Sequence, residues 1–305
     1  MAIDLKKMAD KIKSAKDTIK VYTIKRTSGV DRDNDIYFDD DKEILDEYVQ
    51  KEGNKDYILQ LQLPVEPWIG NTINPKVIIL TGNPRFDYPK PFATPYDRYA
   101  SRMSTSMSTK VFDDYKEILA KQVAMDGVET NNYLTHQFSL NTNDPVFLAD
   151  SYKNKSGKPE LYWNAKLSSL ISDVNAAGMV SDVEKKIAVY EVHGYHSHNF
   201  ENFPGDKLLP SQQFAIESIQ RLAKKNPIFI LFRAEEYWKK HLGDILLQAS
   251  INDRLYKLSS VQNSTISQNN VIKYTPDLWI KEEALKIEKE KCKKGAFTDL
   301  VSKIK

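Results

Sequence analysis

Short runs of apolar residues alternate along this chain with longer segments in which apolar residues recur every three or four positions. Uninterrupted Val, Ile and Leu are typical of strands covered on both faces, and the longer recurrence is typical of amphipathic helices. The pattern predicts four strands, at residues 76–80, 186–192, 228–232 and 255–258. It predicts helices at residues 1–20, from about 41, and at 111–125, 160–177, 210–225 and 235–249. Strands that alternate with helices indicate an α/β fold, and we expect a three-layer α/β/α arrangement around a four-stranded, mainly parallel sheet.

An acidic run at residues 30–46 departs from this alternation. Asp31, Asp33 and Asp35 stand at alternate positions, which raises the question of a calcium loop. Such a loop requires Gly at its sixth place and Glu at its twelfth. Those places hold Ile36 and Lys42, so we exclude calcium and expect a solvated loop that leads into the helix from about residue 41.

The domain organisation is expected to be simple. One domain would take in residues 1–305, with its core at about 60–275. A helical extension at 1–59 would precede the core, and a Lys/Glu-rich helix at 276–305 would follow it.

The composition is ordinary for a soluble globular protein, with 41% hydrophobic and 28% charged residues. A net charge of +2 argues against unspecific coating of DNA, although a local basic groove would suffice to bind nucleic acid. The one cysteine, Cys292, excludes an intrachain disulfide and a thiolate metal cluster. The first twenty residues are too charged for a signal peptide, and no apolar run could span a membrane. We therefore expect a cytoplasmic protein with no membrane partner, and a monomer.

Polar residues of interest follow the predicted strands. In an open parallel sheet, ligands bind in the loops after the carboxyl ends of the strands. Gly82-Asn83-Pro84 follows the first strand, and His193, His196 and His198 follow the second. The long segment 85–110 interleaves aromatic with basic residues, which suits base stacking and phosphate contact but equally suits a loop pinned to the core by its rings.

Taken in order, these post-strand segments resemble motifs of the uracil-DNA glycosylase superfamily. The segment 80–85 resembles the family's first motif, in which an Asn positions the attacking water, and Pro67-Trp68-Ile69-Gly70 resembles the segment before it. The other resembling segments are 190–197, 229–232 with Trp238, and 262–267. A bacterial branch of the superfamily is similar at Tyr195-His196-Ser197, at Leu209-Pro210-Ser211-Gln212 and at 263–270. The resemblance covers roughly residues 60–275.

The resemblance implies a DNA glycosylase that flips a base out of the stack and hydrolyses the N-glycosidic bond of uracil or another modified base. It implies no metal and no cofactor, and a DNA partner that is single- or double-stranded. Roles in base-excision repair and in defence against phages with modified DNA both stay open. The implied catalytic residues are Asn83, Gln262 and Asn263. The implied substrate-binding residues are Gly82, Pro84, Arg85, Phe86, Tyr88, His193, Tyr195, His196, Ser197, Ser264 and Ser267.

One family position is altered, and this keeps two alternatives open. The histidine of the fourth family motif is absent, and Gln262 or Asn263 stands near its place. A glutamine can donate a hydrogen bond to a base carbonyl, but it cannot carry a positive charge. A catalytically silent member of the fold that binds nucleic acid or a partner is therefore one alternative. A metal-dependent hydrolase that uses His193, His196 and His198 is the other, although no carboxylate motif at ligand spacing completes that set.

Overall fold

In a computed structural model of the chain, the described residues form two compact units. The described residues are 19–25, 31–50, 59, 68–70, 74–83, 152–153, 159–160, 162–176, 186–195, 197, 203, 206–260, 262, 264–280, 293 and 295–304. Unit 1 takes its residues from 1–68, 82–128 and 191–217. Unit 2 takes its residues from 69–81, 129–190 and 218–305.

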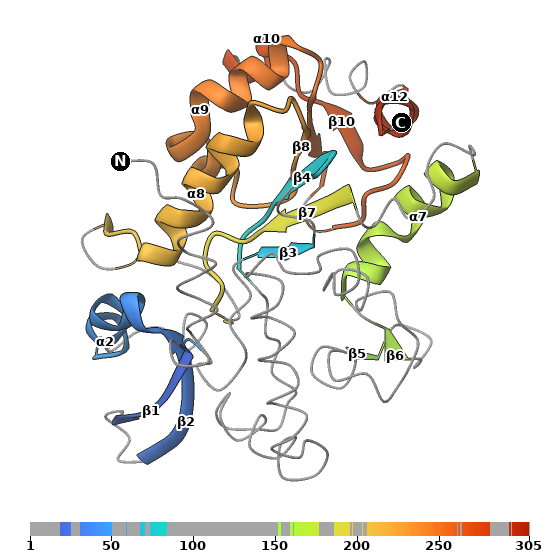
Figure 1. Cartoon of the computed structure of the whole chain (residues 1–305). Coiled ribbons are helices and arrows are strands. Elements are labelled where there is room, and N and C mark those ends of the chain that lie inside the picture. The colour runs from blue at the N-terminus through green and yellow to red at the C-terminus, as the bar shows by residue number, and fades with distance from the viewer. Residues whose placement is uncertain are drawn as a thin grey trace. The chain divides into compact units, whose positions relative to one another are not determined.

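The main sheet is the framework of unit 2 (Figure 1). Its strand order is β10-β9-β8-β4-β7-β3. Strand β4 pairs in parallel with β7 and β8, β8 pairs in parallel with β9, and β10 pairs antiparallel with β9. The bounds are β3 Trp68–Gly70, β4 Val77–Leu80, β7 Ile187–Tyr190, β8 Ile228–Leu231, β9 Leu255–Leu258 and β10 Val271–Lys273.

The α/β class and the mostly parallel sheet are confirmed by these pairings. Every residue of β4, β7 and β8 is buried, which explains why these strands are uninterrupted apolar runs in the sequence. The predicted count of four strands is wrong, because the described sheet has six. Strands β3 and β10 have three residues each, too few for a periodicity to show.

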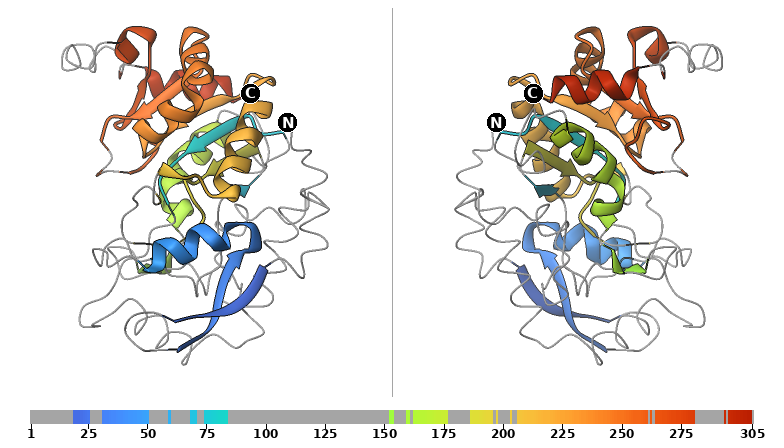
Figure 2. Two further views of the ribbon diagram at one scale, coloured as in Figure 1. Left: turned by 90° about the vertical axis from the view of Figure 1, so that its left-hand side faces the viewer. Right: turned by 90° about the vertical axis from the view of Figure 1, so that its right-hand side faces the viewer.

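Helices lie on both faces of the sheet in unit 2 (Figures 1 and 2). Helices α9 (Glu235–Ile251) and α10 (Pro276–Ile280) lie on one face, and α7 (Tyr162–Ala176) and α12 (Ala296–Lys303) lie on the other. The helices predicted at 160–177 and 235–249 are thus confirmed. Among the described helices, none is long and apolar enough to cross a membrane.

Trp238 of α9 belongs to the core, as its helical spacing predicts. The side chain is buried, and its indole Nε1 donates a hydrogen bond to the backbone oxygen of Thr81 at 2.9 Å. This bond satisfies both the indole donor and a carbonyl just beyond the end of β4.

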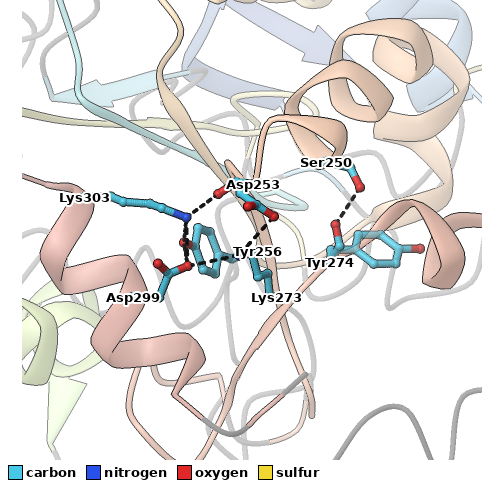
Figure 3. Close-up of polar contacts among 7 residues, drawn as sticks. All are labelled: Ser250, Asp253, Tyr256, Lys273, Tyr274, Asp299 and Lys303. Atoms are coloured by element: carbon cyan, nitrogen blue, oxygen red, sulfur yellow. Dashed lines mark hydrogen bonds and ion pairs between the residues drawn. The ribbon is translucent and has the colours of Figure 1, made fainter. Parts of the chain in front are cut away.

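A polar cluster holds the C-terminal helix α12 on strands β9 and β10 (Figure 3). Tyr256 Oη and Lys303 Nζ both donate to Asp299 Oδ2, at 2.7 and 2.8 Å. Lys303 also donates to the backbone oxygen of Asp253 at 2.7 Å, and Lys273 pairs with the Asp253 carboxylate at 3.0 Å. Burial raises the pKa of Tyr256, as does its bond to Asp299, so the phenol stays protonated and continues to donate.

The described part of unit 1 contains an antiparallel hairpin that the sequence pattern does not predict. Strand β1 (Ile19–Lys25) pairs with β2 (Asp31–Phe38). The expectation of a solvated loop is therefore wrong for residues 31–38. Aspartates at alternate positions fit the two-residue period of a strand, but Asp is depleted in strands, and its presence favoured the loop interpretation.

The helix expected from about residue 41 is confirmed. A 3₁₀ turn, η2 (Asp39–Asp41), follows β2 and leads into α2 (Lys42–Gln50). The helix predicted at 1–20 lies outside the described residues apart from Ile19 and Lys20, which belong to β1. The helix predicted at 111–125 also lies outside them. Two short strands, β5 (Tyr152–Lys153) and β6 (Pro159–Glu160), form a separate antiparallel pair.

Candidate functional site

The segments after β4 and β7 run side by side. Beyond the strand ends, Thr81 N donates to Tyr190 O at 3.0 Å, and Val192 N donates to Gly82 O. Parallel neighbours end at the same edge of a sheet, so the residues that follow them are brought together. This pairing positions Asn83, which comes three residues after the last residue of β4.

The side-chain amide of Asn83 is held by Ser197. Asn83 Nδ2 donates to the backbone oxygen of Ser197 at 3.0 Å and to its Oγ at 2.8 Å. Because both acceptors engage the NH₂ group, the direction of the amide oxygen Oδ1 is also defined. Asn83 is half-buried and Ser197 is buried, so the two bonds are partly shielded from water. The structure thus joins two of the predicted site residues, which are 114 positions apart in the chain.

Gly82 precedes this amide and is buried. A Cβ atom built on Gly82 meets no described atom within 4 Å. Packing among the described residues therefore does not require glycine at this position.

His193 is buried in unit 1, and its contacts define its tautomer. Tyr195 N donates to His193 Nδ1 at 3.2 Å. A nitrogen that accepts a hydrogen bond carries no proton, so the neutral ring holds its proton on Nε2. The ring also packs edge-on against Phe203, with 5.4 Å between the centroids. These two contacts hold the position of the His193 ring.

Tyr195 contacts a buried carboxylate that the sequence pattern does not single out. Its hydroxyl donates to Asp41 Oδ2 at 2.8 Å. Ser211 donates its backbone N–H to Asp41 Oδ1 at 2.9 Å and its hydroxyl to Oδ2 at 2.5 Å. Burial raises the pKa of Asp41 to about 6, against the lowering effect of these hydrogen bonds. The one available signal was an aspartate directly before a helix start, and that position does not reveal burial.

The segment Leu209-Pro210-Ser211-Gln212 has a structural role at the start of α8 (Pro210–Ala223), the confirmed counterpart of the helix predicted at 210–225. Pro210 is the first helical residue, where its missing N–H costs nothing. Leu209 N donates to Gln212 Oε1 at 2.8 Å, which is one half of a capping box. The helix start accounts for Pro210 and Gln212, and Ser211 bonds to Asp41.

Asn270 organises the connection between β9 and β10 in unit 2. Its buried Oδ1 accepts from Ser259 Oγ and from Ser260 N, both at 2.9 Å. Its Nδ2 donates to the backbone oxygens of Ser260 at 3.2 Å and Thr265 at 3.1 Å. One amide therefore links both ends of this connection, which makes it a defined loop.

Three of the predicted site residues that the structure describes lie in this loop. Gln262 is exposed, Ser264 is buried and Ser267 is partly exposed. The backbone oxygen of Ser267 accepts from Asn270 N at 3.0 Å, and the neighbouring Ile266 N donates to Lys166 O of α7 at 3.0 Å. The loop is thereby attached to α7 as well as to its own strands.

A charged cluster in unit 2 was also missed by the sequence pattern. Glu235, the first residue of α9, pairs with Lys239 at 2.8 Å and Lys257 at 2.7 Å, and it accepts from Tyr274 Oη at 2.5 Å. Burial alone would raise the pKa of Glu235, but the hydrogen bonds from Lys239, Lys257 and Tyr274 outweigh it and lower the pKa to about 2. Lys239 Nζ also lies 5.0 Å from the centroid of the Trp279 ring. The cluster stabilises contacts between α9, β9 and α10.

The remaining predicted residues are not all within the described part of the chain. Gly82, Asn83, His193, Tyr195 and Ser197 belong to unit 1, whereas Gln262, Ser264 and Ser267 belong to unit 2. The residues outside the described ranges are Pro84, Arg85, Phe86, Tyr88, His196 and Asn263, and the segment 85–110 and His198 lie outside them too.

Of the three histidines considered as metal ligands, only His193 is among the described residues. Among the residues that the structure describes, no group of three or more His, Cys, Asp or Glu side chains is arranged to hold a metal ion.

Comparisons with known proteins do not connect the chain to a family. No family model, no curated protein and no solved structure matches it.

Proposed function

We propose that this protein is a DNA glycosylase, which releases uracil or another modified base by hydrolysing its N-glycosidic bond. The observation that carries the proposal is the doubly hydrogen-bonded amide of Asn83, directly after a buried parallel strand. The order of the post-strand segments supports it, because this order resembles the uracil-DNA glycosylase superfamily from the segment 80–85 to the segment 262–267. A uracil-DNA glycosylase-like fold of three layers is part of the same proposal.

The chemistry explains why an oriented amide is useful. Cleavage of an N-glycosidic bond leaves negative charge on the departing base and positive charge on the sugar, and a water molecule must then attack the sugar. The Oδ1 atom of Asn83 can accept a hydrogen bond from that water and hold it at a fixed angle. An amide is too weak a base to remove the proton, so Asn83 acts by positioning. Ser197 serves this role indirectly by fixing the amide.

Donors toward the departing base are the second requirement. The resemblance names His193 for substrate binding, and its Nδ1 accepts a hydrogen bond from Tyr195 N. In unit 2, the resemblance also names Gln262, whose exposed side-chain amide is a neutral donor in a loop that Asn270 holds in shape.

The decisive experiment measures base release from single- and double-stranded DNA. The substrates contain uracil, deaminated purines or bulky modified cytosines, and alkali then converts abasic sites into strand breaks. We expect breaks that require both protein and alkali. Asn83→Ala should reduce the rate at least about a hundredfold, because the water loses its fixed position. Ser197→Ala should reduce it about tenfold, since the backbone oxygen of Ser197 still holds the amide.

Asn252→Ala is the matched control, because Asn252 is an exposed residue at the C-terminal end of α9. It should leave the rate unchanged, and thermal unfolding should show that all variants are folded. Full activity of the Asn83→Ala variant would contradict the role given to this amide. Retention of DNA without release of any base would instead favour the silent, nucleic-acid-binding alternative.

A further inference from the structure

A polar groove of about 440 Å³ lies in unit 2, and the glycosylase proposal does not use it. One wall is α7, the other is the loop segment 267–269, and Phe297 of α12 lines it as well. This volume falls within the range of sites that bind small molecules, roughly 300–1,000 Å³.

The lining is polar but almost uncharged. Among the described lining residues, four are serines, three from α7 and Ser267 from the loop, and two carry side-chain amides, Gln268 and Asn269. Within the described part of this lining, Asp173 is the one charged residue and Phe297 is the one aromatic residue. Among the lining residues that the structure describes there is no Lys or Arg, so a phosphate group would meet the Asp173 carboxylate and no described cation.

The two walls are held in place before any ligand arrives. Ile266 N donates to Lys166 O at 3.0 Å, which fastens the loop to α7. The Ser267 backbone oxygen accepts from Asn270 N and Val271 N, and the buried Asn270 side chain holds the rest of the loop. Phe297 is itself buried. A groove with fixed walls loses little conformational freedom on binding, which favours affinity.

We propose that this groove binds a neutral carbohydrate. Hydroxyl and amide groups both donate and accept hydrogen bonds, as sugar hydroxyls do, and a carboxylate accepts from two adjacent hydroxyls at once. A peptide fits less well, because Phe297 is the one apolar residue among the described lining residues and it is buried, so the groove offers little to bind apolar side chains.

The test is a calorimetric titration of the full-length protein with glucose, galactose and maltose. The groove is open to solvent, so we expect at least one sugar to bind with a Kd of about 1 mM. Asp173→Ala and Asn269→Ala should each raise the Kd for that sugar at least about tenfold. Both side chains are exposed, and neither change should alter thermal unfolding.

Asp244→Ala and Asn252→Ala are the matched controls, because both residues are exposed and belong to the α9 region outside the lining. They should leave the sugar affinity unchanged. Absence of binding by all three sugars at about 20 mM would overturn the proposal. Equal weakening by groove and control variants would also overturn it, as would tighter binding of glucose 6-phosphate or of a Gly/Ser hexapeptide at the groove. No DNA enters this experiment, so its failure is separable from failure of the glycosylase proposal.

Discussion

Replacement of Asp41 by Asn is expected to remove a step in the pH dependence of folding. Asp41 is fully buried and accepts three hydrogen bonds, two from Ser211 and one from Tyr195. An Asn has the same shape and stays neutral at every pH. Its oxygen can still accept from Ser211 N, and the two hydroxyl groups can turn to accept from its NH₂ group. The substitution therefore separates the charge of Asp41 from its packing.

The magnitude follows from the pKa of the buried carboxyl. Burial raises this pKa from 3.8 to about 6, a difference of about 2 units or about 3 kcal/mol. Because the folded-state pKa is the higher one, the stabilisation is complete below about pH 4 and is lost as the pH rises through about 6. The advantage of the wild-type chain over Asp41→Asn should therefore shrink by about 3 kcal/mol between those limits.

Urea unfolding of the full-length protein measures this difference. Free energies of unfolding of the wild type and Asp41→Asn are compared at intervals between about pH 4 and about pH 8. Asp46→Asn is the matched control, because Asp46 lies in the same segment but pairs with Lys42 at a partly exposed site. It should change stability by less than about 1 kcal/mol and leave the step between pH 4 and 6 in place.

A second substitution, Asp41→Ala, tests the hydrogen bonds themselves. It leaves the Ser211 N–H and two hydroxyls without their acceptor in a buried place, where each lost partner costs about 1–3 kcal/mol. At low pH this variant should be less stable than Asp41→Asn. A constant difference between wild type and Asp41→Asn across the whole pH range would refute the reasoning about burial.

Three further predictions concern unit 2. Asn270→Ala removes four hydrogen bonds and should speed amide hydrogen exchange at least about tenfold in residues 259–270. The control is Asn269→Ala, which changes an exposed neighbouring residue and should leave the exchange rates unchanged. Trp238→Phe removes the hydrogen bond to the Thr81 carbonyl and should lower the free energy of unfolding, measured with urea, by about 2 kcal/mol. The control Trp279→Phe, at a partly exposed site, should lower it by less than about 1 kcal/mol. Glu235 has a lowered pKa, so the stabilisation that it contributes is present above about pH 4.5 and is lost as the pH falls toward 2. In Glu235→Gln, the free energy of unfolding should therefore depend less on pH in that range. If the free energy of unfolding of this variant fell with acid as steeply as that of the wild type, the role given to the ion pairs with Lys239 and Lys257 would be contradicted.

Periodicity in the sequence predicted the central elements well for a physical reason. A strand covered on both faces must be apolar at every position, and β4, β7 and β8 meet that condition. Edge strands carry no such requirement, so β3 and β10 were not predicted, and the acidic strand β2 was taken for a loop.

In the candidate site, too, some features could be predicted from the sequence and others could not. The position of Asn83 after a buried strand is visible in the sequence, since topology alone places post-strand residues at one sheet edge. The contact between Asn83 and Ser197 is not visible, because 114 positions separate the two residues and no pattern encodes their hydrogen bonds. Asp41 and Asn270 are polar residues whose burial depends on what packs around them.

By itself, the sequence determined the α/β class, the strands that form the centre of the sheet, and the segments that follow them, because local apolar patterns report burial. Only the tertiary structure decided which polar side chains are buried, which hydrogen bonds orient Asn83 and His193, and why Asp41 has a raised pKa. The bond between Tyr195 and His193 is local, but the contacts of Asn83 and Asp41 join residues far apart in the chain. Such contacts leave no periodic trace, and they form only when the chain is folded.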